Sequence, residues 1–188
     1  PIMQLRNTAD TYGALAKFLH WTIVILIIAQ YVIIEAAEEL PDGLEKLAMI
    51  TRHKSIGILV LALALVRIGW KLANKGQPAP VPMPRPQRIA AAAGHGLLYL
   101  LILAQPISGW MMSSAANYPV TFFGWFELPA LVGANEGMHE FYEEVHEFLF
   151  TALLVVTVVH VLAALYHHFV QKDDTLRRML PFGRRRAA

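Results

Sequence analysis

The sequence contains no cysteine among its 188 residues. This absence excludes disulfides, thiolate-bound iron–sulfur clusters, cysteine-based zinc sites and the thioether attachment of c-type haem. Charge is also scarce, because only 16% of the residues are charged whereas 56% are hydrophobic, and the mean hydropathy is +0.44. This composition lies outside that of ordinary soluble domains, so we expect the chain to reside in a lipid bilayer.

Four apolar runs are long enough to cross a membrane. A helix needs roughly 20 residues to span about 30 Å of hydrocarbon, and in lipid the backbone must satisfy its own hydrogen bonds, which favours helices. The sequence therefore predicts an all-α bundle of four transmembrane helices, forming one membrane domain over residues 1–188. The predicted spans are 18–37, 53–72, 91–113 and 144–169.

The charges are distributed unevenly between the two sides of these runs. On one side lie 13 of the 16 Lys and Arg residues, and on the other lie 11 of the 14 Asp and Glu residues. Because Lys and Arg are retained in the cytoplasm, both termini are predicted to be cytoplasmic. The segment 77–86 contains five alternating prolines and is expected to be a stiff, extended cytoplasmic strap. The aromatic stretch 118–125 is expected to cover the opposite face at the lipid interface.

Two histidines of the fourth run share one helix face. His146 and His160 are 14 residues apart, which corresponds to about 21 Å of rise and an angular difference of only about 40°. An ionisable side chain inside an apolar run is expensive and normally functional. Neutral imidazole is the usual axial ligand that a protein without cysteine offers to haem iron. Two ligands at two depths therefore suit two haems stacked across the bilayer.

A bis-histidine haem needs a second imidazole at each depth. On the external side, His53 opens the second run at the level of His146. On the cytoplasmic side, His20 opens the first run and His95 begins the third, both near the level of His160. Depth alone does not decide between His20 and His95.

Three further residues near the cytoplasmic interface have two readings each. His167 lies seven residues after His160 on nearly the same face, and with Lys172 it suits hydrogen bonding to a quinone carbonyl and proton exchange with the cytoplasm. The same two side chains equally suit ordinary interfacial residues that snorkel. Arg67, near the cytoplasmic end of the second run, is placed to pair with a haem propionate or to act as a positive-inside anchor.

Short motifs lie at the helix ends, namely Phe18-Leu19-His20-Trp21, Arg52-His53-Lys54-Ser55-Ile56-Gly57, Gly94-His95-Gly96-Leu97-Leu98-Tyr99, Pro106-Ile107-Ser108-Gly109 and the tail from His167 to Met179. In their order, and over nearly the whole chain, these motifs resemble those of the bacterial cytochrome b561 family. The resemblance implies a four-helix inner-membrane cytochrome with two b-type haems that exchanges electrons with a quinone such as ubiquinone. It implies His20 with His160 for the cytoplasmic haem and His53 with His146 for the external one, and it leaves His95 and His167 near a haem or in the quinone site.

The expected function is electron transfer across the bacterial inner membrane, between a quinone site and a periplasmic donor or acceptor, with no nucleic-acid partner. Some members of the family are superoxide oxidases, but the 11 acidic and three basic residues on the external side disfavour an anionic substrate. Superoxide is therefore a secondary candidate. Two alternatives stay open: a haem-bearing anchor subunit of a larger dehydrogenase or hydrogenase, and a non-redox transporter whose histidines relay protons or bind metal.

Overall fold

The computed structural model describes residues 4–74, 78 and 81–182. Four long helices follow one another along the chain: α1 (Ala14–Glu38), α2 (Leu44–Ala73), α3 (Arg85–Ala115) and α4 (Glu136–Phe169). A single short helix, α5 (Thr175–Met179), follows α4. Each of the four long helices is long and apolar enough to cross a membrane. The predicted helical, four-span architecture is thus confirmed.

All four helices begin before the apolar runs from which they were predicted. For example, α2 begins at residue 44 rather than 53, and α4 begins at 136 rather than 144. An apolar run measures only the part of a helix that hydrocarbon covers, whereas the helix itself continues until its backbone is capped. At the start of α4, the Asn135 side chain accepts a hydrogen bond from the backbone N–H of Met138 at 2.9 Å.

The proline-rich segment predicted over 77–86 ends earlier than expected. Arg85 and Pro86 form the first turn of α3, where the N–H that proline lacks is unsatisfied in any helix. Pro84, the N-cap residue, has φ −55° and ψ 147°, which is close to the polyproline II conformation. Residues 77, 79 and 80 of the predicted strap lie outside the described residues.

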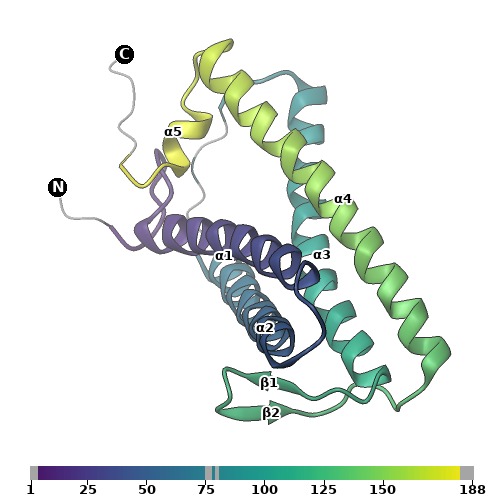
Figure 1. Cartoon of the computed structure of the whole chain (residues 1–188). Helices are drawn as coiled ribbons and strands as arrows, with labels where there is room; N and C mark the ends of the chain where they lie inside the picture. The colour runs from purple at the N-terminus through teal and green to yellow at the C-terminus, as the bar shows by residue number, and fades with distance from the viewer. Residues whose placement is uncertain (1–3, 75–77, 79–80, 183–188) are drawn as a thin grey trace.

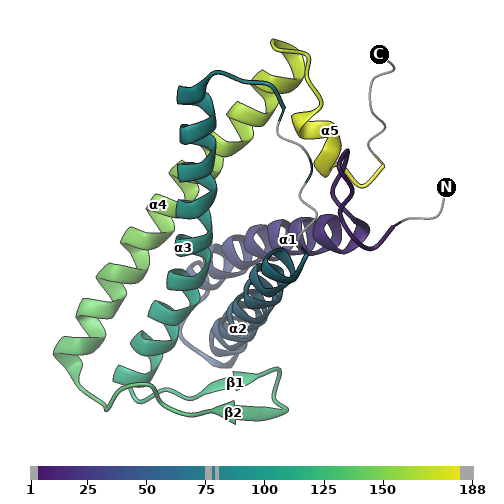
Figure 2. The same ribbon diagram turned by 180° about the vertical axis from the view of Figure 1, so that it is seen from behind.

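The four long helices form two pairs, and the pairs pack together. α1 packs along α2, α3 packs along α4, and α2 also contacts α3. Figures 1 and 2 both show the first turns of α1 and α3, the last turn of α4 and α5 at one end of the bundle, which we call the terminal end. The β-strands lie at the opposite end, which we call the hairpin end.

Few side chains are buried inside the bundle. The buried apolar residues of the four long helices are few and include Leu19, Val60, Leu101 and Leu153. Most large apolar side chains of the helices face outward instead; Ile25 on α1 and Phe148 on α4, for example, are 63% and 72% exposed. An outer surface of this kind is stable only when lipid covers it.

The aromatic stretch that was expected to be an interfacial cover is a β-hairpin. Strands β1 (Val120–Phe122) and β2 (Phe126–Leu128) are antiparallel. The two residues after β1, Phe123 and Gly124, have φ values of 51° and 75°, as in a type I′ turn, where glycine avoids the strain of positive φ. Trp125, which closes the turn, is 79% exposed.

Candidate functional site: two pairs of histidines

The structure brings four histidines together as two pairs at different depths. At the terminal end, His20 of α1 faces His160 of α4 with ring centroids 6.4 Å apart. At the hairpin end, His53 of α2 faces His146 of α4 with ring centroids 6.5 Å apart. Since α4 is one unbroken helix from Glu136 to Phe169, its two histidines are separated by about 21 Å along the helix axis.

The spacing of each pair fits a single metal ion held between two imidazoles. A metal lies about 2.0–2.1 Å from an imidazole nitrogen, and the ring centroid lies roughly 1.1 Å behind that nitrogen, so two opposed rings have centroids about 6.2–6.4 Å apart. The observed values are 6.4 and 6.5 Å. Among the described residues, no three His, Asp or Glu side chains form a metal-binding group. A donor set of two imidazoles suits haem, in which the macrocycle provides the other four ligands.

His95, the third histidine at the terminal end, is placed differently. Its ring centroid is 5.3 Å from that of His160, which is about 1 Å shorter than the spacing expected across a metal ion. Its Nδ1 donates a hydrogen bond of 2.7 Å to the carbonyl of Ala91, one turn earlier on α3. His95 therefore packs against His160 at its edge, whereas His20 stands at the spacing of an opposing ligand.

The hairpin-end pair lines a cavity of about 530 Å³ between the four helices. This volume lies within the range of small-molecule and cofactor sites. Gly109 of α3 lines the cavity and lies directly against the His146 ring, because a Cβ atom at this position would be 2.9 Å from Cε1 of His146. Only glycine allows α3 to approach the imidazole so closely.

The hydrogen bonds of His146 define its tautomer. The single hydroxyl hydrogen of Ser108 is donated to the carbonyl of Gln105 at 2.8 Å, so Ser108 Oγ must accept from Nδ1 of His146 at 2.9 Å. Nε2 then carries a lone pair, which faces the side-chain nitrogen of Gln105 at 3.2 Å. Oε1 of Gln105 is buried without a hydrogen-bond partner in the described part of the chain. This orphaned oxygen and the lone pair on Nε2 fit a site built for a bound group.

His53 is oriented in the same way. Its Nδ1 lies 3.3 Å from the backbone carbonyl of Gln30 on α1 and 2.6 Å from the side-chain amide of the same residue, so Gln30 contacts Nδ1 and leaves Nε2 as the candidate ligand atom. Outer hydrogen bonds of this kind fix the orientation and basicity of metal-binding imidazoles. Both hairpin-end histidines therefore have their Nδ1 partners within the protein.

Ser55 attaches the β-hairpin to α2 two residues after His53. Its hydroxyl donates to the carbonyl of Thr121 at 2.8 Å and accepts from the backbone N–H of Phe123 at 3.1 Å. The side chain is fully buried, with 1% of its surface exposed. The strands are thereby held against the helix that carries one ligand candidate, and Val120 of β1 lines the cavity.

At the terminal end, Arg67 of α2 connects α1 and α3. Its Nη1 donates to the carbonyl of Ala16 at 3.1 Å, and its Nε donates to the hydroxyl of Tyr99 at 3.3 Å. Ala16 lies one turn before His20, and Tyr99 lies one turn after His95. The guanidinium therefore lies beside the cluster of terminal-end histidines, where it suits a carboxylate such as a haem propionate.

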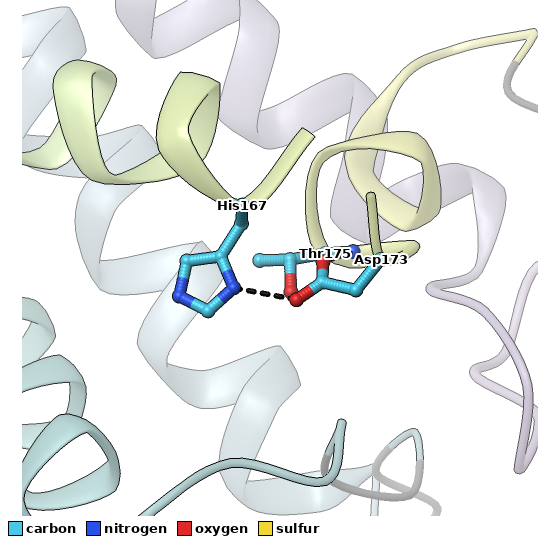
Figure 3. Close-up of polar contacts among 3 residues, drawn as sticks. All are labelled: His167, Asp173 and Thr175. Atoms are coloured by element: carbon cyan, nitrogen blue, oxygen red, sulfur yellow. Dashed lines mark hydrogen bonds and ion pairs between the residues drawn. The ribbon is translucent and has the colours of Figure 1, made fainter. Parts of the chain in front are cut away.

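His167 and Lys172, the quinone candidates, lie at the last turn of α4 and in the turn that follows it. His167 donates its Nδ1 hydrogen to the carboxylate of Asp173 (Figure 3), with 2.5 Å between Nδ1 and Oδ2. Lys172 is exposed and has a φ of 55°. Thus the two candidates are close in sequence but differ in exposure, because only His167 is enclosed by the turn.

Sequence reasoning missed several residues that organise these sites. Ser108 and Gln105 are polar side chains inside the third apolar run, where such groups are costly unless they are hydrogen-bonded. The cost of burying these polar groups could have identified Ser108 and Gln105 as candidate site residues. The bond partner of each group was not predictable, since it comes from another helix. Asp173 belongs to the tail motif, but its contact with His167 depends on the reversal of the chain after α4.

The protein is a bundle of membrane-spanning helices with two pairs of imidazoles at different depths, and its sequence has no cysteine. These features are typical of the class of membrane cytochromes with b-type haem. Comparison with known proteins agrees. The family model for prokaryotic cytochrome b561 matches residues 11–182, and the chain belongs to this family. Members of the family are multi-pass proteins of the bacterial inner membrane that transfer electrons, and the family implies b-type haem.

Individual relatives cover almost the entire chain. Cytochrome b561 homolog 2 of Escherichia coli K12 is 37% identical over 180 residues, which are 95% of each chain. A protein named probable superoxide oxidase CybB, from Yersinia pestis, is 34% identical over 171 residues, or 90% of this chain and 96% of that protein. Cytochrome b562 of Cereibacter sphaeroides is 29% identical over 174 residues, or 90% and 94% of the two chains.

Proposed function

We propose that the protein holds two b-type haems and carries electrons between a quinone at the terminal end and a redox partner at the hairpin end. His20 and His160 would hold one haem, and His53 and His146 would hold the other. The observation that carries the proposal is the spacing of the two pairs, 6.4 and 6.5 Å between ring centroids. When bound, haem supplies the one-electron redox chemistry.

The protein's own residues prepare both sites. At the hairpin end, Ser108 and Gln30 contact the Nδ1 atoms of His146 and His53, which leaves the two Nε2 atoms as the candidate ligand atoms. At the terminal end, Arg67 would neutralise a haem propionate, and His95 would lie beside the haem without binding it. The 5.3 Å spacing between His95 and His160 supports this division of roles.

The distribution of charge supports an orientation with the terminal end in the cytoplasm. Of the 12 Lys and Arg residues that the structure describes, nine belong to the segments at the terminal end, and positive residues are retained on the cytoplasmic side. In this orientation both chain termini are cytoplasmic. The β-hairpin and the cavity around His53 and His146 face the periplasm.

The quinone, for which we propose ubiquinone, binds at the cytoplasmic interface near His167 and Lys172. His167 lies seven residues beyond His160 on α4, which is about 10 Å along the helix axis. An imidazole and an ammonium group at the headgroup level are suitable partners for the oxygens of a quinone, and they have access to water for proton exchange.

The partner at the hairpin end is a cationic protein or a neutral small molecule. Four glutamates line the cavity of the hairpin-end pair, namely Glu35, Glu38, Glu143 and Glu147. Their field attracts cations and repels anions. Superoxide is the second candidate, because the relative from Yersinia pestis is named a probable superoxide oxidase, and Lys54 lines the same cavity as a local positive charge.

Absorption spectroscopy of the purified protein, first oxidised and then reduced, tests the proposal. We expect low-spin b-type spectra, two haems per chain, and reduction by a ubiquinol analogue without any other subunit. A spectrum without haem would contradict the proposal. A protein that is reduced only in complex with a copurifying dehydrogenase or hydrogenase would support the anchor-subunit alternative. Membership of an electron-transfer family disfavours the non-redox transporter.

A further inference from the structure

The chain reverses direction immediately after α4. Lys172 has a left-handed backbone conformation, with a φ of 55°, and the backbone N–H of Asp173 donates to the carbonyl of His167 at 3.1 Å. The reversal returns the Asp173 carboxylate to the His167 imidazole (Figure 3). Both side chains are shielded from solvent, with 14% and 15% of their surfaces exposed.

Asp173 is held by a second contact on its other side. Its Oδ1 accepts a hydrogen bond of 2.8 Å from the backbone N–H of Thr175, the first residue of α5. α5 is in turn attached to α1, because Nε1 of Trp21 donates to the carbonyl of Met179 at 2.9 Å. The carboxylate therefore has one oxygen for α5 and one for His167, and it has little freedom to rotate.

The chemistry of this contact determines the tautomer of His167. A carboxylate can only accept, so Nδ1 carries a hydrogen in the neutral ring as well as in the cationic ring. Burial raises the pKa of the Asp173 carboxyl, but the hydrogen bonds from His167 and Thr175 lower it further, and the net pKa lies below its usual value. The carboxylate thus persists as an acceptor. The lone pair of the neutral ring lies on Nε2, which points away from Asp173 in Figure 3.

We propose that Asp173 is a positioning residue, which fixes His167 in the tautomer whose Nε2 accepts a hydrogen bond from a quinol hydroxyl. This inference rests on the proposed quinone site and specifies its chemistry. Asp173 itself does not contact the quinol. A histidine that merely snorkels at the interface needs no fixed tautomer, so the tautomer distinguishes a functional His167 from an ordinary interfacial one.

Asp173→Asn is the informative variant, because it is almost isosteric and removes one acceptor. The Thr175 N–H can only donate and keeps the amide oxygen on its side. The amide NH2 group then faces Nδ1 of His167, and the ring shifts its hydrogen to Nε2 to provide an acceptor at Nδ1. The variant therefore turns Nε2 of the neutral ring from an acceptor into a donor.

The test uses the haem-loaded protein in nanodiscs and a ubiquinol analogue in stopped-flow experiments. Loss of such an orienting partner typically costs about 10- to 100-fold, and we expect a fall of this size in the rate of reduction by quinol. Inhibition by the matching quinone should become stronger, because a donor at Nε2 suits a carbonyl. Asp173→Glu keeps a carboxylate and should restore part of the rate. Asp174→Asn, which removes the same charge one residue later, should leave the rate within about twofold.

His167→Gln separates this inference from the proposed quinone site. If quinol reduces the His167→Gln variant as fast as the parent protein, the quinone site is elsewhere and the inference is wrong as well. If His167→Gln is slow while Asp173→Asn is fast, the quinone site stands and the role of Asp173 is refuted. If both are slow, the double variant should be no slower than either single variant, because the two residues act as one unit.

A measurement on the parent protein covers the case in which Asp173→Asn fails to fold or loses haem. Nitrogen-15 NMR distinguishes histidine tautomers, and the His167 signals are identified by their absence in His167→Gln. We expect a protonated Nδ1 in the neutral ring and an Nε2 without hydrogen. A neutral ring that carries its hydrogen on Nε2 would refute the inference regardless of any rate.

Discussion

The two ends of the bundle hold histidine pairs of nearly equal spacing in different surroundings. At the hairpin end, only His53 and His146 are paired, and each has its Nδ1 occupied by a partner inside the protein. At the terminal end, His95 adds a third imidazole to His20 and His160, and the guanidinium of Arg67 lies close by. The hairpin end is therefore organised by neutral hydrogen bonds, and the terminal end by a third ring and positive charge.

This difference indicates how one fold can set two redox sites apart. Hydrogen bonds to the outer nitrogen of a ligand raise its basicity and favour the oxidised metal. A nearby positive charge favours the reduced state instead, since reduction lowers the total charge of the site. Both effects act in the same direction here, and they predict a higher midpoint potential at the terminal end than at the hairpin end.

Removal of one ligand from each pair should have the largest effect. We expect His146→Ala and His160→Ala each to lower the haem content from two per chain toward one, because the two histidines lie about 21 Å apart on α4. A pyridine haemochrome assay measures the ratio. His168→Ala, on the same helix, should keep both haems. The ligand assignment is wrong if both alanine variants retain two haems.

A second comparison separates the two candidate partners of His160. Since only His20 stands at the spacing of an opposing ligand, His20→Ala should lose the terminal-end haem, whereas His95→Ala should keep it with a small spectral shift. Haem content and the low-spin spectrum of both variants provide the measurement. Loss of haem from His95→Ala alone would reverse the assignment.

The hydrogen bond from His146 to Ser108 should matter only at the hairpin end. We expect Ser108→Ala to weaken haem binding there by about 10- to 100-fold, the usual cost of losing an outer partner of a metal ligand. Titration of the haem-free protein with haemin resolves the two sites. Ser114→Ala is the matched control, because Ser114 is a buried serine of α3 that accepts from Leu131 and not from a histidine. If Ser108→Ala and Ser114→Ala bind haemin at the hairpin end with equal affinity, Ser108 does not contribute to haem binding.

The charge of Arg67 should affect the terminal end alone. Arg67→Gln is expected to lower the midpoint potential of that haem by several tens of millivolts, because about 1 kcal/mol of charge interaction corresponds to roughly 40 mV for one electron. The hairpin-end potential should stay the same. Arg88→Gln, an exposed position of α3, is the control, and a redox titration followed at both haem bands gives the values. Equal shifts at both haems would contradict a local role.

The smallest expected effect concerns access to the hairpin end. Because four glutamates line its cavity, reduction by superoxide should accelerate or stay constant as salt is added, since salt screens repulsion over about 10 Å at 0.1 M. Pulse radiolysis at several ionic strengths measures this dependence. Fast reduction that slows with added salt would mean that Arg52 and Lys54 attract the anion, and the preference for a cationic or neutral partner would then be wrong.

Much of this architecture was predictable because it depends on patterns along a single helix. Hydropathy predicted four spans, since any segment that crosses hydrocarbon must be long and apolar. The 14-residue interval between His146 and His160 predicted two depths on one face, since the helical period is constant. The asymmetry of Lys and Arg predicts an orientation by the same one-dimensional logic. That orientation, the binding of haem and the quinone site stay predictions.

Tertiary structure decided everything that depends on contacts between helices. Depth placed both His20 and His95 near His160, and only the packing of α1 and α3 against α4 gives one of them a centroid distance of 6.4 Å and the other 5.3 Å. The tautomer of His146 depends on a serine 38 residues away, and that of His167 depends on a left-handed turn after α4. Hydropathy and helical periodicity carry no information on such contacts, because each helix forms its backbone hydrogen bonds internally whichever helix lies beside it. The neighbouring helix is selected by side-chain packing.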